Sequence, residues 1–283
     1  MQELVLTLSC HDRPGIVALV AGFLADRGFT IRDSQQFGDE DTGQFFLRIH
    51  AASDSEFDFD TVRAEFGARV GDVLGASWSI HDPRRRDRIL VMVSRQGHCL
   101  NDLLHRARTG TMPAEVVAVV SNHHDFRELV EWHGIPFHHV PVTPETKESA
   151  EEELRKLVAA YDADSVILAR YMQILSDRLC RELAGRAINI HHSLLPSFKG
   201  ARPYYQAHAR GVKVVGATAH YVTGDLDEGP IIEQDFSRVD HQMSARDLTE
   251  LGRDLEALAL ARAVTAHAEH RVLLNGTKTV VFR

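Results

Sequence analysis

One stretch of the sequence, residues 187–234, combines an amide, an imidazole and several carboxylates at a spacing suited to acyl-group chemistry. Asn189 and His191 lie two positions apart at an apolar segment, and alternate residues of an extended backbone point to the same side. Three carboxylates follow in the loop 224–230 (GDLDEGP). An amide can stabilise an oxyanion, an imidazole can transfer a proton, and a carboxylate can orient the imidazole or a water molecule. Each residue alone also has a structural explanation: a turn-forming Asn, a core or surface His, and a solvated acidic loop.

The elements that must position these residues alternate between strands and helices. The stretch 193–203 is rich in Gly and Pro and predicts a shaped loop between the strand that begins at Ala187 and a second strand at 214–221. Upstream, the pattern predicts strands at 89–94, 116–120, 137–140 and 166–169, and helices around 99–108, 124–133, 145–160 and 176–184. This order predicts a doubly wound, mostly parallel α/β sheet, in which ligands bind beyond the carboxyl ends of the strands. A long helical pattern (245–270) and a final strand around 280–282 complete it.

The N-terminal part of the chain has a different order of elements. Strands at 3–9, 29–37, 43–51 and 76–81 and helices after Pro14 and around 59–70 predict a ferredoxin-like βαββαβ unit. The basic segment 81–88 (HDPRRRDR) is interrupted by acids and indicates a solvated linker rather than a phosphate site. We therefore expect two domains, residues 1–83 and residues 84–283.

Composition excludes several classes of protein. At roughly 150 residues per domain, a chain of 283 residues predicts about two domains. A net charge of −8 argues against a nucleic-acid-binding surface. The three cysteines lie far apart, and the 17 histidines lack the spacing of zinc helices or fingers, so neither a disulfide framework nor a metal site is expected. The sequence has neither a signal-peptide pattern nor an apolar run of about 18 residues, which predicts a cytoplasmic protein without membrane spans.

Four segments together resemble a known family. Residues 189–191 (NIH), 193–196 (SLLP), 220–223 (HYVT) and 226–232 (LDEGPII) are similar to the formyltransferase family that handles 10-formyltetrahydrofolate. That family includes glycinamide ribonucleotide transformylases, methionyl-tRNA formyltransferases and formyltetrahydrofolate deformylases. The resemblance implies that Asn189, His191 and Asp227 form the catalytic group.

The resemblance also implies a folate pocket along residues 169–175 (ARYMQIL), formed largely by backbone hydrogen bonds. Met172, Ile174 and Leu175 can supply its apolar wall, although from the sequence alone they could equally belong to the core. Gln173 stands where the family leads us to expect an arginine, which leaves only the backbone role at this position. The implied folate-binding residues are Tyr171, Met172, Gln173, Ile174, Leu175, His220, Val222 and Gly224.

Two departures distinguish branches of the family. The turn 94–100 (SRQGHCL) lacks the Gly-rich phosphate loop of the transformylases and resembles the turn of the deformylases. We expect Gly97, His98 and Cys99 to fill the acceptor side, leaving room for little more than water.

The N-terminal unit resembles an ACT domain, with Asp12, Pro14 and Gly15 at the turn that binds an amino-acid effector such as glycine or methionine. A plain dimerisation unit is the alternative.

The resemblance implies hydrolysis of 10-formyltetrahydrofolate to tetrahydrofolate and formate, which supplies formate for purine synthesis and balances one-carbon folate pools. It implies no metal or redox cofactor, because the folate is the substrate. It also implies a homo-oligomer, either a dimer or a tetramer. Two other functions stay open: a glycinamide ribonucleotide formyltransferase, and a non-catalytic folate or amino-acid sensor.

Overall fold

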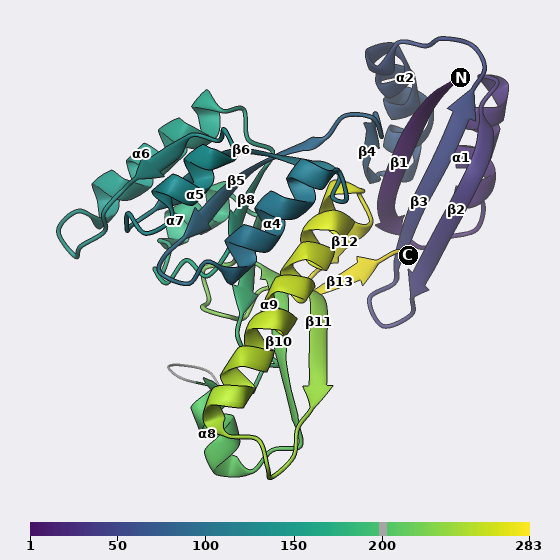
Figure 1. The fold of residues 1–283 in the computed structure, drawn as a ribbon. Helices are drawn as coiled ribbons and strands as arrows, with labels where there is room; N and C mark the ends of the chain where they lie inside the picture. Colours follow the sequence, from purple (N-terminus) through teal and green to yellow (C-terminus); the bar gives the residue numbers. More distant parts are fainter. Residues whose placement is uncertain (198–202) are drawn as a thin grey trace. The chain divides into compact units, whose positions relative to one another are not determined.

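The computed structural model describes residues 1–197 and 203–283 (Figure 1). The expected loop 193–203 therefore lies partly outside the described residues. The chain forms two compact units, Met1–Arg86 with Glu269–Arg283, and Asp87–Ala268. The expected boundaries, 1–83 and 84–283, assigned residues 269–283 to the second domain, whereas the structure groups them with the first unit. Among the described residues, no helix is long and apolar enough to cross a membrane.

The first unit has the predicted βαββαβ order. Its described strands form an antiparallel sheet in the order β2-β3-β1-β4. Alternate residues of β1, namely Leu4, Leu6 and Leu8, are fully buried with the apolar residues of the helices. The elements are β1 (Gln2–His11), α1 (Ile16–Asp26), β2 (Thr30–Asp39), β3 (Gln44–Ser53), α2 (Phe59–Phe66), the π-helical turn η1 (Gly67–Gly71), α3 (Asp72–Leu74) and β4 (Ser77–His81).

The end of the chain forms a hairpin, β12 (Val272–Asn275) and β13 (Lys278–Val281), instead of the single expected strand. Side-chain hydrogen bonds join it to the first unit. The Nδ2 atom of Asn275 donates to Asp39 at 2.6 Å, and Nε of Arg48 donates to the carbonyl of His270 at 3.2 Å. These contacts between residues far apart in the sequence explain why the local pattern did not reveal the hairpin's place.

The second unit is the predicted doubly wound α/β fold. Its described strands form one sheet in the order β11-β10-β9-β8-β5-β6-β7. Neighbours from β9 to β7 pair in parallel, and β10 and β11 run antiparallel. The elements are β5 (Asp87–Val93), α4 (His98–Thr109), β6 (Ala114–Ser121), α5 (Arg127–Trp132), β7 (Phe137–His139), α6 (Lys147–Ala160), β8 (Ser165–Leu168), α7 (Asp177–Glu182), β9 (Ala187–His191), α8 (Pro203–Arg210), β10 (Val214–Tyr221), β11 (Ile231–Arg238) and α9 (Ala245–Ala268).

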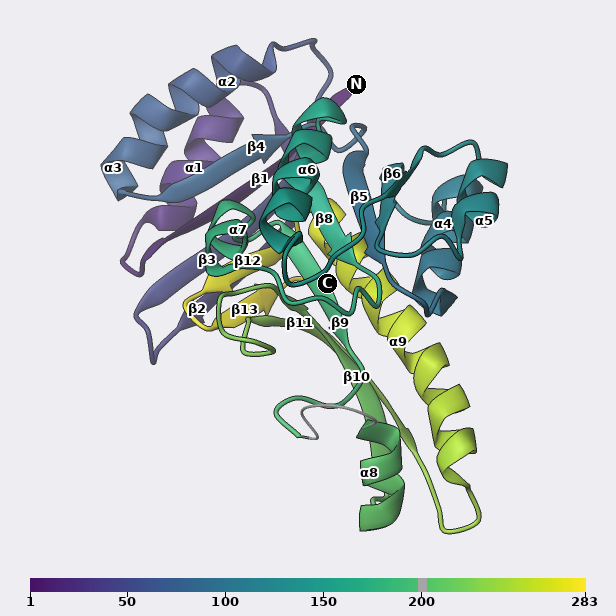
Figure 2. The same ribbon diagram turned by 90° about the vertical axis from the view of Figure 1, so that its left-hand side faces the viewer.

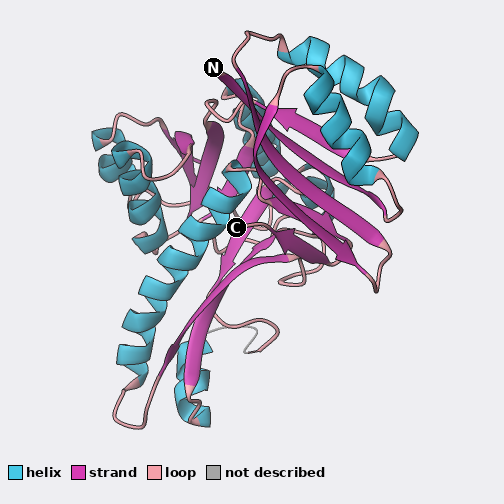
Figure 3. Cartoon of the chain, turned by 90° about the vertical axis from the view of Figure 1, so that its right-hand side faces the viewer, coloured by secondary structure: helices cyan, strands magenta, loops and turns pink. Residues whose placement is uncertain are grey.

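Helices cover both faces of the central strands. In Figure 2, α6 and α7 lie on one side of β5 and β8, and α4 and α9 lie on the other. The sequence reason is the continuous apolar run of β5, in which Ile89, Leu90 and Val91 are all fully buried. The long helix α9 packs along β10 and β11 (Figure 3). Helix α9 thereby brings side chains from late in the sequence to the carboxyl end of β9.

Candidate active site

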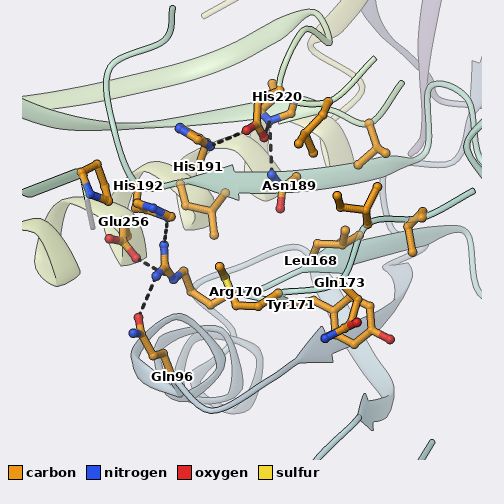
Figure 4. A pocket seen from close by; sticks show the side chains of 18 of the residues that line it. Gln96, Leu168, Arg170, Tyr171, Gln173, Asn189, His191, His192, His220 and Glu256 are labelled. Atoms are coloured by element: carbon orange, nitrogen blue, oxygen red, sulfur yellow. Dashed lines mark hydrogen bonds and ion pairs between the residues drawn. The ribbon is translucent and has the colours of Figure 1, made fainter. Parts of the chain in front are cut away.

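A cavity of about 610 Å³ lies at the carboxyl ends of β8 and β9. Its walls come from residues 168–175, from 189–192 at the end of β9, from the loop 222–227 after β10, and from α8 and α9 (Figure 4). This is the edge of the sheet at which ligands bind in doubly wound folds. Asn189, His191 and Asp227, the three predicted catalytic residues, all line it.

His191 and Asp227 form a hydrogen-bonded pair at the centre of the site. Nδ1 of His191 lies 3.2 Å from Oδ2 of Asp227. The hydrogen bond from His191 lowers the pKa of Asp227, and burial opposes this effect without outweighing it. Asp227 is therefore an anion at neutral pH. Among the described residues, Nε2 of His191 is buried without a hydrogen-bond partner, so the hydrogen-bonding capacity of this nitrogen is unused.

His220 orients the amide of Asn189. Its Nδ1 lies 2.8 Å from the carbonyl oxygen of Tyr221, which can only accept, so Nδ1 carries the proton. Burial lowers the pKa of His220, which keeps the ring neutral and leaves Nε2 as an acceptor. Nδ2 of Asn189 lies 3.2 Å from this Nε2 and donates to it. Because an amide nitrogen has two N–H donors, the second is left for a ligand.

The loop that carries Asp227 is shaped by its backbone. Asp227 has a φ of 57°, in the left-handed region that few residues other than glycine adopt. A Cβ added at Gly229 would lie 1.7 Å from the carbonyl oxygen of Tyr221, so only glycine fits there. The N–H of Tyr221 in turn donates to the carbonyl of Pro230 at 2.9 Å. The motif Leu-Asp-Glu-Gly-Pro therefore folds back on β10 and places Asp227 beside His191.

Comparisons with known proteins agree with this geometry. The formyl transferase family model matches residues 87–264, and the ACT domain model matches residues 4–58. A formyltetrahydrofolate deformylase of Corynebacterium sp. (strain P-1) is 51% identical over 280 residues, covering 99% of this chain and 98% of that protein. The chain belongs to the formyltetrahydrofolate deformylase family. The crystal structure of a formyltetrahydrofolate deformylase from Pseudomonas syringae pv. tomato matches with a TM-score of 0.97 and 48% identity, covering 100% of this chain and 95% of that one.

The transformylase branch is more distant. A glycinamide ribonucleotide transformylase from Symbiobacterium toebii matches with a TM-score of 0.66 and 31% identity, covering 70% of this chain and 95% of that one. The match to the deformylase structure includes the first unit as well, because it covers the whole chain. The deformylase family therefore accounts for both units, as the resemblance in the sequence implied.

In this member of the deformylase family, the predicted folate residues all line the cavity. Met172 and Ile174 are 57% and 60% exposed, which excludes the alternative that they belong to the core. Leu175 and Tyr171 are buried and pack in the core below them. The N–H of Met172 is held by Oγ of Ser94 at 3.0 Å. The predicted residues in the lining are Tyr171, Met172, Gln173, Ile174, Leu175, His220, Val222 and Gly224.

The expected acceptor side requires a correction. Gly97, His98 and Cys99 are not among the residues that line the cavity, and Gln96 takes that place. Cys99 is fully buried at the start of α4, and a Cβ at Gly97 would lie 2.4 Å from the ring of Phe126. Cys99 is one of the core-facing residues of α4, whereas His98 is only half-buried. His98, Cys99 and Glu256 also hold potential metal-ligating atoms within 4.8 Å of one another, but His98 already hydrogen-bonds Glu256 at 2.7 Å.

A cluster that the sequence reasoning missed occupies the acceptor side instead. Glu256 of α9 is 1% exposed and accepts from the hydroxyl of Tyr204 at 2.8 Å, and its Oε2 lies 3.4 Å from Nε of Arg170. Burial acts to raise the pKa of Glu256, but the hydrogen bond from His98 and the charge of Arg170 outweigh it, so the pKa lies below its ordinary value. The sequence contains one feature that could have revealed this cluster. Glu256 is a carboxylate on the apolar face of α9, beside Leu255 and Leu260.

The predicted effector residues lie in the first unit, at the turn between β1 and α1. Asp12, Pro14 and Gly15 are all exposed there. Gly15 has a φ of 96° and caps α1, a conformation that favours glycine. The N–H of Asp12 donates to the carbonyl of Gly43 at 2.9 Å, which ties the turn to the start of β3. The structure brings the three residues together on one exposed turn.

Proposed function

We propose that the chain hydrolyses 10-formyltetrahydrofolate to tetrahydrofolate and formate, with Asn189, His191 and Asp227 as the reacting group. The observation that carries this proposal is the convergence of these residues in the cavity, with Nδ1 of His191 3.2 Å from Asp227 and Nε2 left to the substrate. Membership of the deformylase family supports the same reaction. The product formate would serve purine synthesis and balance the one-carbon folate pools.

The arrangement supports a proton transfer through one imidazole. Nδ1–H of His191 donates to Asp227, so Nε2 can take a proton from the attacking water as its oxygen bonds to the formyl carbon. The tetrahedral oxyanion that forms is stabilised by the free N–H of Asn189 and by the protonated His191. His191 then passes the proton to N10 as the carbon–nitrogen bond breaks. Tetrahydrofolate leaves with that proton, and the second proton of the water leaves with formate.

The two sides of the cavity suit the two parts of this reaction. The side with Met172, Ile174 and Leu226, all more than half exposed, offers apolar surface to a flat aromatic ring. The opposite side holds Arg170 and Glu256, whose charges offset each other. Arg253 of α9 also lines the cavity. Because the charges of Arg170 and Glu256 offset each other, this pair attracts an ionic acceptor such as a sugar phosphate less than an unpaired arginine would, which favours water. The folate itself is the substrate, and we propose that the reaction uses no resident metal or redox cofactor.

A competition assay separates this proposal from formyl transfer. Purified protein with 10-formyltetrahydrofolate is assayed for formate and for formylated product, with and without glycinamide ribonucleotide. We expect release of formate that the ribonucleotide does not change. Formylated ribonucleotide in place of formate would support the transformylase alternative, and neither product would support a non-catalytic sensor.

We further propose that the ACT unit binds glycine or methionine at the turn formed by Asp12, Pro14 and Gly15, within a cytoplasmic dimer or tetramer. The exposure of this turn and the match to the ACT family model support the proposal. Calorimetry with each amino acid, together with the rate of formate release, tests it. If neither amino acid binds and the rate is unchanged, the unit has an assembly role only.

A further inference from the structure

Three imidazoles line the cavity, those of His191, His192 and His220, but the proposed reaction needs only one of them to carry a proton. Burial lowers the pKa of His220 and keeps its ring neutral, and the bond to the carbonyl of Tyr221 places the proton on Nδ1. His192 directly follows His191, and the two rings stack with centroids 5.1 Å apart and planes 11° apart. The protonation state of His192 therefore acts directly on the proposed proton carrier.

Arg170 determines that state. Figure 4 shows its guanidinium between Gln96, His192 and Glu256. Nη1 of Arg170 contacts Nδ1 of His192, and Nη2 donates to Oε1 of Gln96 at 2.9 Å. A guanidinium has only N–H donors and keeps its charge at any pH that a protein survives. Nδ1 of His192 must therefore accept, and a neutral ring with an unprotonated Nδ1 carries its proton on Nε2.

We infer that Arg170 is a positioning residue that holds His192 as the neutral tautomer protonated on Nε2, and so leaves His191 as the only proton carrier among the imidazoles of the cavity. Protonation of Nδ1 would break the hydrogen bond and place a second cation against Arg170. Glu256 pairs with Nε of Arg170 at 3.4 Å, whereas Nη1 of Arg170 is the atom that contacts His192.

The other groups around His192 are consistent with a neutral ring. Tyr204 of α8 lies with its ring centroid 6.5 Å away, and burial raises the pKa of its hydroxyl, which stays uncharged. Asp227 attracts a protonated His192, but its direct partner is His191 at 3.2 Å, whereas Arg170 contacts the His192 ring itself.

Arg170 is itself fixed in place. Its side chain is 8% exposed, and its φ of 63° lies in the left-handed region that side-chain-bearing residues rarely adopt. Its carbonyl accepts from the N–H of Ser94 at 3.2 Å. The segment after β8 therefore turns sharply at Arg170 and directs the guanidinium across the cavity wall. A rigid donor at this position can select one tautomer of His192.

The assignment of the His192 tautomer does not depend on the proposed function. The role of His191 as the only proton carrier does rest on the proposed function. The first test is nitrogen NMR of the full chain labelled with ¹⁵N-histidine, without substrate, in which the variant His192→Gln identifies the His192 signals. In the native protein we expect an unprotonated Nδ1 and no titration of His192 between about pH 5 and 8. In Arg170→Met we expect His192 to titrate with a midpoint near its ordinary value of about 6.5.

Three further variants complete the test. Arg170→Met leaves Glu256 as an unpaired buried charge, which can prevent folding. The double variant Arg170→Met with Glu256→Gln removes both charges and replaces the single variant if that one does not fold. Arg262→Met is the matched control, because Arg262 is 51% exposed and pairs with Asp235 at 3.1 Å on the surface. Arg170→Lys keeps a cationic donor, and we expect it to restore at least part of the resistance of His192 to protonation.

The pH profile of formate release gives a second readout. We expect the profile of Arg170→Met to contain one more ionisation of histidine type than that of the native enzyme. A His192 that titrates in the native protein, or whose proton is on Nδ1, would overturn the inference. So would an Arg170→Met variant in which the His192 signals are unchanged. An enzyme that shows the expected tautomer but releases no formate would contradict the proposed function and leave the tautomer assignment standing.

Discussion

Asp227→Asn tests whether the pair of His191 and Asp227 drives the chemical step. The substitution keeps the shape of the side chain and removes its charge. We expect kcat for formate release to fall by about 10²–10⁴-fold, because the imidazolium that forms at His191 loses its anionic partner. Binding of a non-reactive folate analogue should change much less, since Asp227 is only one part of a lining that extends over residues 168–175 and 222–227.

The separation of the two groups sets the magnitude. At an effective dielectric constant of about 20, unit charges 3.2 Å apart attract each other by about 5 kcal/mol. Complete loss of that attraction in the transition state corresponds to a rate decrease of about 10³–10⁴-fold. The side chain of Asp227 is 14% exposed, and water therefore screens part of the charge, which extends the expected range down to about 10².

The assay measures formate by a coupled dehydrogenase and analogue affinity by calorimetry. Glu228→Gln serves as the matched control, because Glu228 is an exposed carboxylate in the same loop and does not line the cavity. We expect this control to keep native kcat. A kcat within about threefold of native for Asp227→Asn would refute the proposed role of the pair, given the range above.

Four further outcomes are expected. Asn189→Ala should lower kcat by about 10²–10³-fold through loss of an oxyanion donor, measured by formate release with the analogue affinity as control. Gly252→Ala should lower the free energy of unfolding in urea by about 1–3 kcal/mol, because the added Cβ would lie 2.0 Å from Cζ of Tyr204. The folded-state pKa of Glu256 is lowered, so its stabilisation is present above the ordinary carboxyl pKa of about 4.3 and is lost as the pH falls through the folded-state value. Urea unfolding of Glu256→Gln should therefore depend less on pH below about 5 than unfolding of the native chain. Asp12→Ala should abolish binding of glycine or methionine in calorimetry and leave the rate without effector unchanged.

Local patterns in the sequence were sufficient for most of the fold. Period-two alternation and helical spacing predicted the βαββαβ unit and the strands and helices from β5 to α7, because both depend on which face of a segment is buried. The hairpin 272–281 escaped this reasoning. The position of the hairpin depends on hydrogen bonds such as that of Asn275 to Asp39 at 2.6 Å. These two residues lie far apart in the sequence, so a local pattern does not predict their contact.

The same division applies to the site. Asn189 and His191 could be assigned to one side of a strand by their spacing alone, and both line the cavity. Residues that reach the cavity from distant elements could not be found in this way. Arg170 and Glu256 come from the end of β8 and the middle of α9, and their pairing at 3.4 Å exists only once the sheet and helix have packed. His98 and Cys99 were placed in the cavity by sequence, but Cys99 is fully buried at the start of α4 and His98 is half-buried against Glu256. Spacing determines which side chains share a face, whereas tertiary packing decides which faces meet.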